Sequence, residues 1–223
     1  MNLTAPILTA LVAILGFSSV AHAQANPTVP RVRQGFYLRA TGGPGFAGFS
    51  GDGPTRSASL YGMGDAQSLS IGGSLAPGLV LAGTLQSTST RTTFRGGPFR
   101  AATLTVDGAS SSASHEAFAS FTQLGVLLDW YPVPTAGWHA GLSGGLGAVG
   151  VISSADNSTL VGISPAGTLF GGYDWRIGGD WSLGLELVAS GAGAASLKRS
   201  SGDDTGYRLT PVSVSVQASI LYF

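Results

Sequence analysis

The chain has no cysteine, few charged residues and only three histidines. Without cysteine it has no disulfide, no thiol nucleophile and no thiolate metal site. Charged residues make up 10% of the 223, whereas about a quarter is usual in soluble domains. The formal net charge of zero gives no support for nucleic-acid binding. Beyond the N-terminus no apolar run approaches the roughly 18 residues of a spanning helix, so we expect no helical membrane span.

The first 23 residues have the pattern of an export signal. Residues 7–20 are almost wholly apolar, and Ala21-His22-Ala23 gives the small-x-small pattern that a signal peptidase reads. We expect cleavage after Ala23, although residues 1–6 contain no Lys or Arg. A buried N-terminal helix is the alternative. Residues 24–34 are polar and contain proline, and we interpret them as a short periplasmic lead-in to a domain over 35–223.

That domain is dominated by alternation of apolar and polar residues. Residues 212–223 read VSVSVQASILYF, with Val, Ala and Ile on one face and Ser and Gln on the other. A period of two indicates a β-strand with one apolar and one polar face. Eight segments have strand character: 35–43, 67–75, 79–88, 121–131, 138–149, 163–175, 181–191 and 209–223.

The connections between these segments alternate between short and long. The short ones, rich in Pro, Gly and Asp, are 76–78, 132–137 and 177–180, and the long polar ones are 44–66, 89–120, 152–162 and 192–208. Short periplasmic turns and long outer loops are typical of a transmembrane barrel, and an even strand number closes the sheet. The prediction is therefore an all-β, closed antiparallel up-and-down barrel of eight strands. Because residues 101–107 could add a strand pair, ten strands remain the alternative.

Aromatic residues support the same orientation. The four tryptophans, Trp130, Trp138, Trp175 and Trp181, each flank a short turn, and Tyr131, Tyr222 and Phe223 are expected at the same level. Amphipathic aromatics gather at membrane interfaces. We therefore expect a girdle on the periplasmic rim that includes the four tryptophans and Tyr222.

On these patterns, 35–223 resembles the small eight-stranded outer-membrane barrels, the group of the OmpA membrane domain, OmpX and OmpW. The resemblance implies an outer-membrane location and partners in lipid, lipopolysaccharide and the barrel-assembly machinery, which reads a terminal aromatic preceded by alternating hydrophobics. Leu221 and Phe223 fit that signal, but Ser219, Gln217 and Ser215 in the same register do not. Either a bulge changes the phase near the C-terminus or Phe223 turns away from lipid. We expect no second, peptidoglycan-anchoring domain, and we expect a monomer.

If the apolar faces meet lipid, the opposite faces place a polar network in the lumen. Its expected members are Arg39, Gln123, Asp129, His139, Asp174, Arg176 and Glu186. Thr41 and Ser143 are expected to join them by hydrogen bonds. Buried charges are costly unless paired, so the network predicts either an occluding plug or a gate in which Arg39 or Arg176 exchanges carboxylate partners.

Catalysis has little support in the sequence. Some similar barrels modify lipid A with a His, a Ser and a carboxylate. His139 and Ser143, however, lie four apart on one strand, about 13 Å along it. His115 lies beside Glu116 in a Ser-rich loop, and Asp203-Asp204 is a weak hint of calcium. We expect no enzyme activity, cofactor or metal site.

The second long connection carries Arg91, Arg95 and Arg100 around Phe94 and Phe99. Guanidinium groups bind phosphates bidentately, so these arginines are expected lipopolysaccharide contacts, with ordinary loop solubility as the alternative. The predicted role is structural or surface interaction through the long outer loops. The alternatives are a narrow channel or carrier for small solutes or hydrophobic molecules and, third, a lipid A-modifying enzyme.

Overall fold

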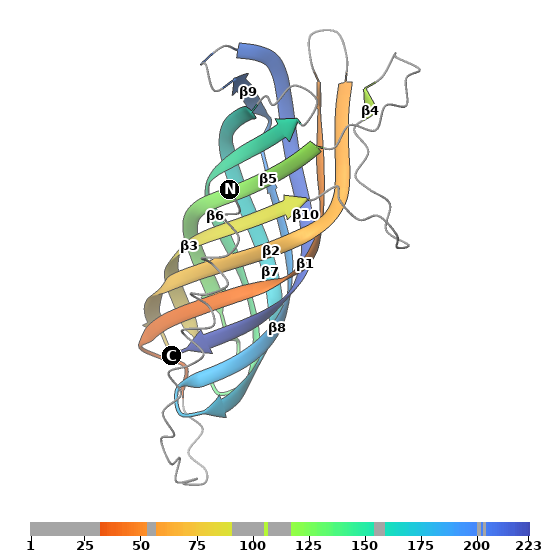
Figure 1. Cartoon of the computed structure of the whole chain (residues 1–223). Helices are drawn as coiled ribbons and strands as arrows, with labels where there is room; N and C mark the ends of the chain where they lie inside the picture. Colours follow the sequence, from red (N-terminus) through yellow and green to blue (C-terminus); the bar gives the residue numbers. More distant parts are fainter. Residues whose placement is uncertain are drawn as a thin grey trace, which may run out of the picture.

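A closed ring of antiparallel strands makes up the protein (Figure 1). The computed structural model describes residues 32–52, 57–90, 105–106, 117–153, 159–199, 202 and 204–223. Its strands are β1 (Phe36–Asp52), β2 (Ser57–Ala76), β3 (Leu79–Thr90), β4 (Thr105–Val106), β5 (Ala117–Trp130), β6 (Trp138–Ser153), β7 (Thr159–Gly178), β8 (Trp181–Ala192), β9 (Ala195–Arg199) and β10 (Asp204–Tyr222). Within these ranges no helix is long and apolar enough to cross a membrane.

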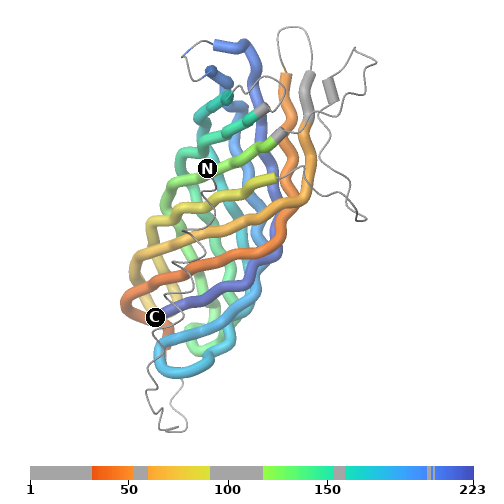
Figure 2. Tube along the Cα trace, viewed as in Figure 1, coloured from red at the N-terminus to blue at the C-terminus, as the bar shows by residue number. Residues whose placement is uncertain are grey.

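Eight of these strands form the ring, in the order β1, β2, β3, β5, β6, β7, β8 and β10. The last of them, β10, pairs with β1, so the beginning and the end of the barrel meet along one seam. Figure 2 shows this seam, where the blue end of β10 runs beside the red start of β1. Every strand in the ring therefore has two partners, as a membrane-spanning sheet requires. The predicted closed up-and-down barrel is confirmed.

The two remaining short strands do not widen the barrel to ten. Among the residues that the structure describes, β4 pairs with β2 alone, at Ala58 and Ser59. β9 pairs with β7 and β10, the same two neighbours as β8, but with its register shifted by one residue. β9 is thus the continuation of β8 beyond a one-residue bulge at Gly193 and Ala194.

Alternation of the side chains sets the inside and the outside of the wall. In β8, Ser182, Glu186 and Ser190 are buried, while Leu183 and Leu187 on the opposite face are exposed. An apolar side chain on the outside of a transmembrane barrel faces lipid, and polar side chains face the lumen. The same pattern extends along β10, where the valines are exposed and the serines are buried.

The strands extend further than the sequence patterns predicted. Most of the expected loop 44–66 is strand, because β1 continues to Asp52 and β2 begins at Ser57, paired residue for residue. The expected loops 152–162 and 192–208 are likewise largely strand. A spanning strand needs only about 9–11 residues, so the 17 residues of β1 and the 20 of β2 and β7 carry the wall well beyond the membrane at the long-loop end.

The lumen is filled in three layers. Near the short turns lie aromatic and charged side chains, among them Tyr37, Arg39 and Tyr131. The middle layer consists of Ser, Thr and Gln side chains. At the long-loop end is an apolar cluster of Ala47, Phe49, Leu60, Ala119, Phe121, Val149, Ala195, Leu197 and Leu209. An eight-stranded barrel is narrow enough for side chains alone to fill it, and here they do so at all three levels.

Candidate functional site

Arg39 lies at the centre of a buried charged network in the lumen near the short turns. It points inward from β1 and is 2% exposed. Its Nη2 donates to Asp174 Oδ2 at 2.7 Å and to the Tyr131 hydroxyl at 2.8 Å. Its Nη1 donates to Glu186 Oε2 at 3.2 Å and lies 3.3 Å from Asp129 Oδ2. A single guanidinium thus joins β1 to strands on the opposite side of the barrel.

Two of the three carboxylates that meet Arg39, Asp129 and Asp174, have further donors. Asp129 accepts from the Tyr37 hydroxyl at 3.1 Å and lies 3.0 Å from His139 Nδ1. Asp174 accepts from the Tyr131 hydroxyl at 2.6 Å and from Ser219 Oγ at 3.2 Å. Buried charges are tolerated when they are paired and hydrogen-bonded, and of the Arg39 guanidinium nitrogens only Nε has no hydrogen-bond partner.

The imidazole of His139 is held between these groups. Its ring stacks on the Tyr131 ring, with centroids 5.1 Å apart and an interplanar angle of 21°. Its Nε2 lies 3.7 Å from Asp174 Oδ2. The structure thus brings together five predicted lumen residues: Arg39, Asp129, His139, Asp174 and Glu186.

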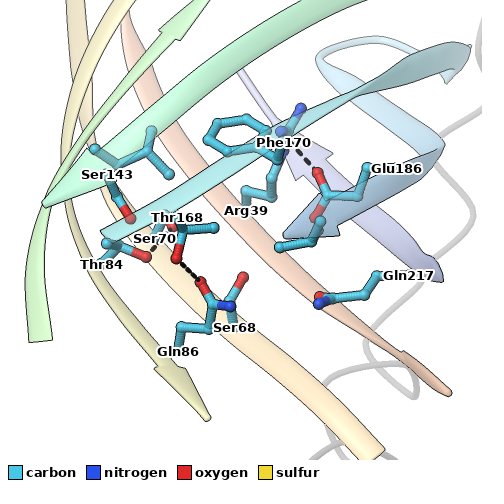
Figure 3. Close-up of a pocket in the computed structure, with 12 residues that line it drawn as sticks. Arg39, Ser68, Ser70, Thr84, Gln86, Ser143, Thr168, Phe170, Glu186 and Gln217 are labelled. Carbon is cyan, nitrogen blue, oxygen red and sulfur yellow. Dashed lines mark hydrogen bonds and ion pairs between the residues drawn. The ribbon is translucent and has the colours of Figure 1, made fainter. Parts of the chain in front are cut away.

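Gln123, Thr41 and Ser143 lie in the neighbouring layer of hydroxyls and amides. Gln123 donates to Ser143 Oγ at 3.0 Å and accepts from Thr168 Oγ1 at 2.9 Å. Thr41 donates to the Gln217 amide oxygen. A cavity of about 20 Å³ lies between this layer and the charged network, lined by Arg39, Glu186, Thr168 and Gln86 among others (Figure 3). That volume is enough for about one water molecule.

The prediction that Arg176 belongs to the lumen network is wrong. It is exposed at the end of β7, beyond Asp174 and just before an irregularity in the pairing with β8. The physical reason is that the lumen ends at the level of Asp174, so the next inward position on the strand already lies at the mouth.

Three participants in the network were missed. Tyr37 and Tyr131 are buried beside Arg39, and alternation could have found both, since Tyr37 shares a face with Arg39 and Tyr131 with Asp129. Tyr131 was instead predicted at the level of the aromatic girdle. Arg33 was assigned to a periplasmic lead-in, yet it is 3% exposed and its Nη1 lies 3.5 Å from Asp174 Oδ2. No sequence pattern marks Arg33, because it precedes the first strand.

His139 and Ser143, the histidine and serine of the lumen considered for catalysis, are not hydrogen-bonded to each other. His139 is directed at Asp129, whereas Ser143 accepts from Gln123, so the two make separate hydrogen bonds. Within the described ranges no group of three or more His, Asp or Glu side chains is placed to hold a metal ion. His115 and Asp203 lie outside the described residues, and Asp204 begins β10.

Comparison with known proteins identifies the fold. No protein-family model and no curated protein sequence matches the chain. Among solved structures, OprG from Pseudomonas aeruginosa is similar over 87% of this chain and 99% of its own, at 9% identity and a TM-score of 0.52. The chain has the fold of the small outer-membrane barrels.

Two further structures have weaker similarity to this barrel. Neisserial surface protein A covers 84% of this chain and 96% of its own, at 12% identity and a TM-score of 0.47. The outer membrane protease OmpT from Escherichia coli covers 87% of this chain and 98% of its own, at 8% identity and a TM-score of 0.43. The apolar outer wall and this fold agree with the outer-membrane location that the sequence predicted.

The tryptophans of the outer-membrane barrel lie at its short-turn rim. Trp130, Trp138, Trp175 and Trp181 are all exposed on the outer wall. Trp181 contacts Tyr222 with ring centroids 5.1 Å apart, and Tyr173 contacts both Trp138 and Trp175 at 5.0 Å. Tyr131 does not belong to this rim, because it points into the lumen.

The last residues of the barrel turn inward. Leu221 is completely buried, and the Phe223 ring packs against Tyr37 and Tyr131 with centroids 5.4 and 5.7 Å apart. The register between β10 and β1 is continuous from Tyr222 to Ala218. The sequence left two alternatives, a bulge near the C-terminus or a Phe223 that turns away from lipid. The second is correct, because the register has no bulge here and Phe223 packs in the lumen. The expected lipopolysaccharide contacts Arg91, Arg95 and Arg100 lie outside the described residues.

Proposed function

We propose that this outer-membrane barrel does not conduct and is not an enzyme, and that it acts as a structural or surface-interaction element through its long-loop end. The single observation that supports this most is the Arg39 network, which crosses the lumen from β1 to β5, β7 and β8. An open porin needs a water-filled channel, whereas here the largest residue of the lumen is 2% exposed and fixed by three carboxylates.

The projecting hairpins are the proposed working surface. β1–β2, β6–β7 and β9–β10 extend the wall past the length that a membrane requires. The apolar cluster around Phe49 and Phe121 packs inside this extension, so the extension has a core of its own. A rigid platform of this kind positions the connecting residues for binding at the surface.

Single-channel recording in a planar bilayer tests the closed lumen. We expect no discrete conductance steps from the folded protein. Steady conductance at low voltage would contradict the proposal and favour a narrow channel. The cavity beside Arg39 is the specific observation that keeps a channel as the second candidate, because Arg39 lies within reach of three carboxylates and could exchange between them.

Lipopolysaccharide is the proposed partner of the long-loop end, on the evidence of Arg91, Arg95 and Arg100 in the sequence. Replacing all three by Ala should weaken binding to lipopolysaccharide micelles by at least about tenfold, because guanidinium–phosphate contacts are strong and bidentate. Arg176→Ala, at the opposite end of the barrel, is the control. Equal binding by the triple variant and the unaltered protein would remove these arginines as contacts.

The absence of enzyme activity is tested on lipid A. Mass spectrometry of lipid A from cells with and without the protein should give identical acyl and phosphate patterns. A change that depends on His139 or Ser143 would overturn the non-enzymatic assignment. Similarity to an outer-membrane protease at the level of the fold alone carries no activity with it.

A further inference from the structure

Residues 32–34 form a strap across the short-turn mouth of the barrel. The Arg33 backbone N–H donates to the Pro134 carbonyl at 3.1 Å, and the Arg33 carbonyl accepts from Gly78 N–H at 3.1 Å. The strap therefore joins the β2–β3 turn to the β5–β6 turn. The Gly78 carbonyl also accepts from the Tyr131 N–H at 2.7 Å. The strap and both turns therefore make one continuous set of backbone hydrogen bonds.

Close packing at this crossing explains the glycine at position 78. Gly78 has a φ of +76°, a conformation that other residues rarely adopt. A Cβ there would also lie 2.6 Å from the Tyr131 carbonyl oxygen and 2.9 Å from Pro134 Cγ. The glycine therefore lets the β2–β3 turn lie close against the β5–β6 turn, and the strap binds both turns.

The side chain of Arg33 fixes the strap from inside the mouth. Its Nε donates to the Ala136 carbonyl and its Nη2 to the Asp174 carbonyl, both at 3.1 Å. Its guanidinium carbon lies 4.5 Å from the centre of the Tyr131 ring and 5.7 Å from that of Phe223. Guanidinium groups stack favourably on aromatic faces. Arg33 thus contacts two turns, β7 and the C-terminal residue at once.

The strap is also the outermost part of the lumen closure on this side. Arg33 and Arg39 both contact Asp174, with Arg33 on the side of the mouth and Arg39 on the side of the cavity. A second cavity of about 50 Å³ lies beside the strap and is lined by Val32, Arg33, Arg176, Ser182 and Phe223 among others. Ser182 is 4% exposed and lines this cavity together with the strap, so a strap that leaves the mouth should uncover it.

Arg33 makes most of the contacts of the strap, and at the end of the strap Gly35 exchanges two hydrogen bonds with Ser74. The strap precedes β1 and belongs to no ladder, and the neighbours of Arg33, Val32 and Gln34, are both exposed. We propose that residues 32–34 are a lid over the periplasmic mouth, latched by Arg33, and that releasing the latch opens the mouth as far as the Arg39 network. This goes beyond the surface role, because it concerns access to the lumen from the opposite end.

Thiol labelling tests the lid directly, since the chain has no cysteine of its own. Ser182→Cys is introduced as the probe beneath the lid, and labelling with a membrane-impermeant maleimide is timed on the folded protein. In combination with Arg33→Ala we expect labelling about 30-fold faster than with Arg33 intact, the factor that corresponds to about 2 kcal/mol. Unchanged labelling would overturn the proposal.

Three controls make the result specific. Thr135→Cys, exposed on the β5–β6 turn, should label equally with and without Arg33. Ser190→Cys, which lies in the hydroxyl layer beyond Arg39, should stay protected in both. Gln34→Ala changes an exposed side chain of the same strap and should leave Ser182→Cys labelling within about threefold. If it accelerates labelling as much as Arg33→Ala does, the assignment of Arg33 as the latch fails.

A measurement on the unaltered protein guards against a variant that does not fold. Trypsin cleaves after Arg33 only when that side chain leaves the mouth. Folded protein should therefore be cleaved there at least about 30-fold more slowly than protein unfolded by heat in detergent, with the new N-terminus at Gln34 read by mass spectrometry. Cleavage at equal rates would show that the latch is open and would refute the lid. Conductance plays no part in either readout, so the lid and the closed lumen can fail separately.

Discussion

Replacing Arg39 by Met should destabilise the barrel severely. The substitution keeps the length of the side chain but removes the cation that lies 2.7 to 3.3 Å from Asp174, Glu186 and Asp129. Removing one partner of a buried ion pair costs about 3–5 kcal/mol, because the remaining charge stays buried without compensation. Since proteins of this size are stable by about 5–15 kcal/mol, we expect the urea midpoint to fall markedly.

The assay is urea unfolding in phospholipid vesicles, followed by the fluorescence of the four rim tryptophans. A double-mutant cycle with Asp174→Asn should show coupling of about 2 kcal/mol or more, because both variants remove the same contact. Arg208→Ala, an exposed arginine on β10, should change stability by less than about 0.5 kcal/mol. A loss below about 1 kcal/mol for Arg39→Met would show that the network does not hold the lumen together.

Three further substitutions test other parts of the barrel by the same unfolding measurement. Tyr131→Phe removes the hydroxyl that accepts from Arg39 and donates to Asp174, and should cost about 1–3 kcal/mol; a neutral result would mean that water replaces it. Leu185→Arg places a charge in the apolar belt of β8 and should cost about 2–4 kcal/mol. Ser196→Arg, at an exposed position of β9, should be nearly neutral, and equal costs would disprove the inferred position of the membrane. Gly64→Ala would push a Cβ into the Ser89 carbonyl oxygen and should cost about 1–3 kcal/mol, whereas a Cβ at Gly83 has no neighbour nearer than 3.9 Å and Gly83→Ala should be tolerated.

The fold was predictable because lipid and lumen impose a period of two on every spanning strand. The segment 181–191 alternates cleanly, and the structure places its leucines outside and its serines inside. Beyond the membrane this rule no longer applies. The stretch Ser50-Gly51-Asp52 reads as loop, yet it pairs with β2 and β10, since the neighbouring strands supply hydrogen bonds that composition does not reveal.

The charged site was predictable only in part, for a related reason. Alternation gave the inward direction of Arg39, Asp129 and Asp174, but the pairing among them depends on the tilt and register of strands far apart in sequence. The error at Arg176 arose because alternation does not show where the lumen ends. Arg33 has no periodic neighbours at all, and its place follows from the turns that it crosses.

The seam between β1 and β10 makes the barrel an all-or-none structure. Seven of the eight contacts around the ring join strands that follow one another, and hairpins of that kind form early because little chain must be ordered first. The eighth contact needs the whole chain, and until it forms two strands present unpaired backbone groups, each costing several kcal/mol in lipid. A chain that stops before residue 204 should therefore yield no partly assembled protein in the membrane. Stable insertion of all the other strands depends on the last one.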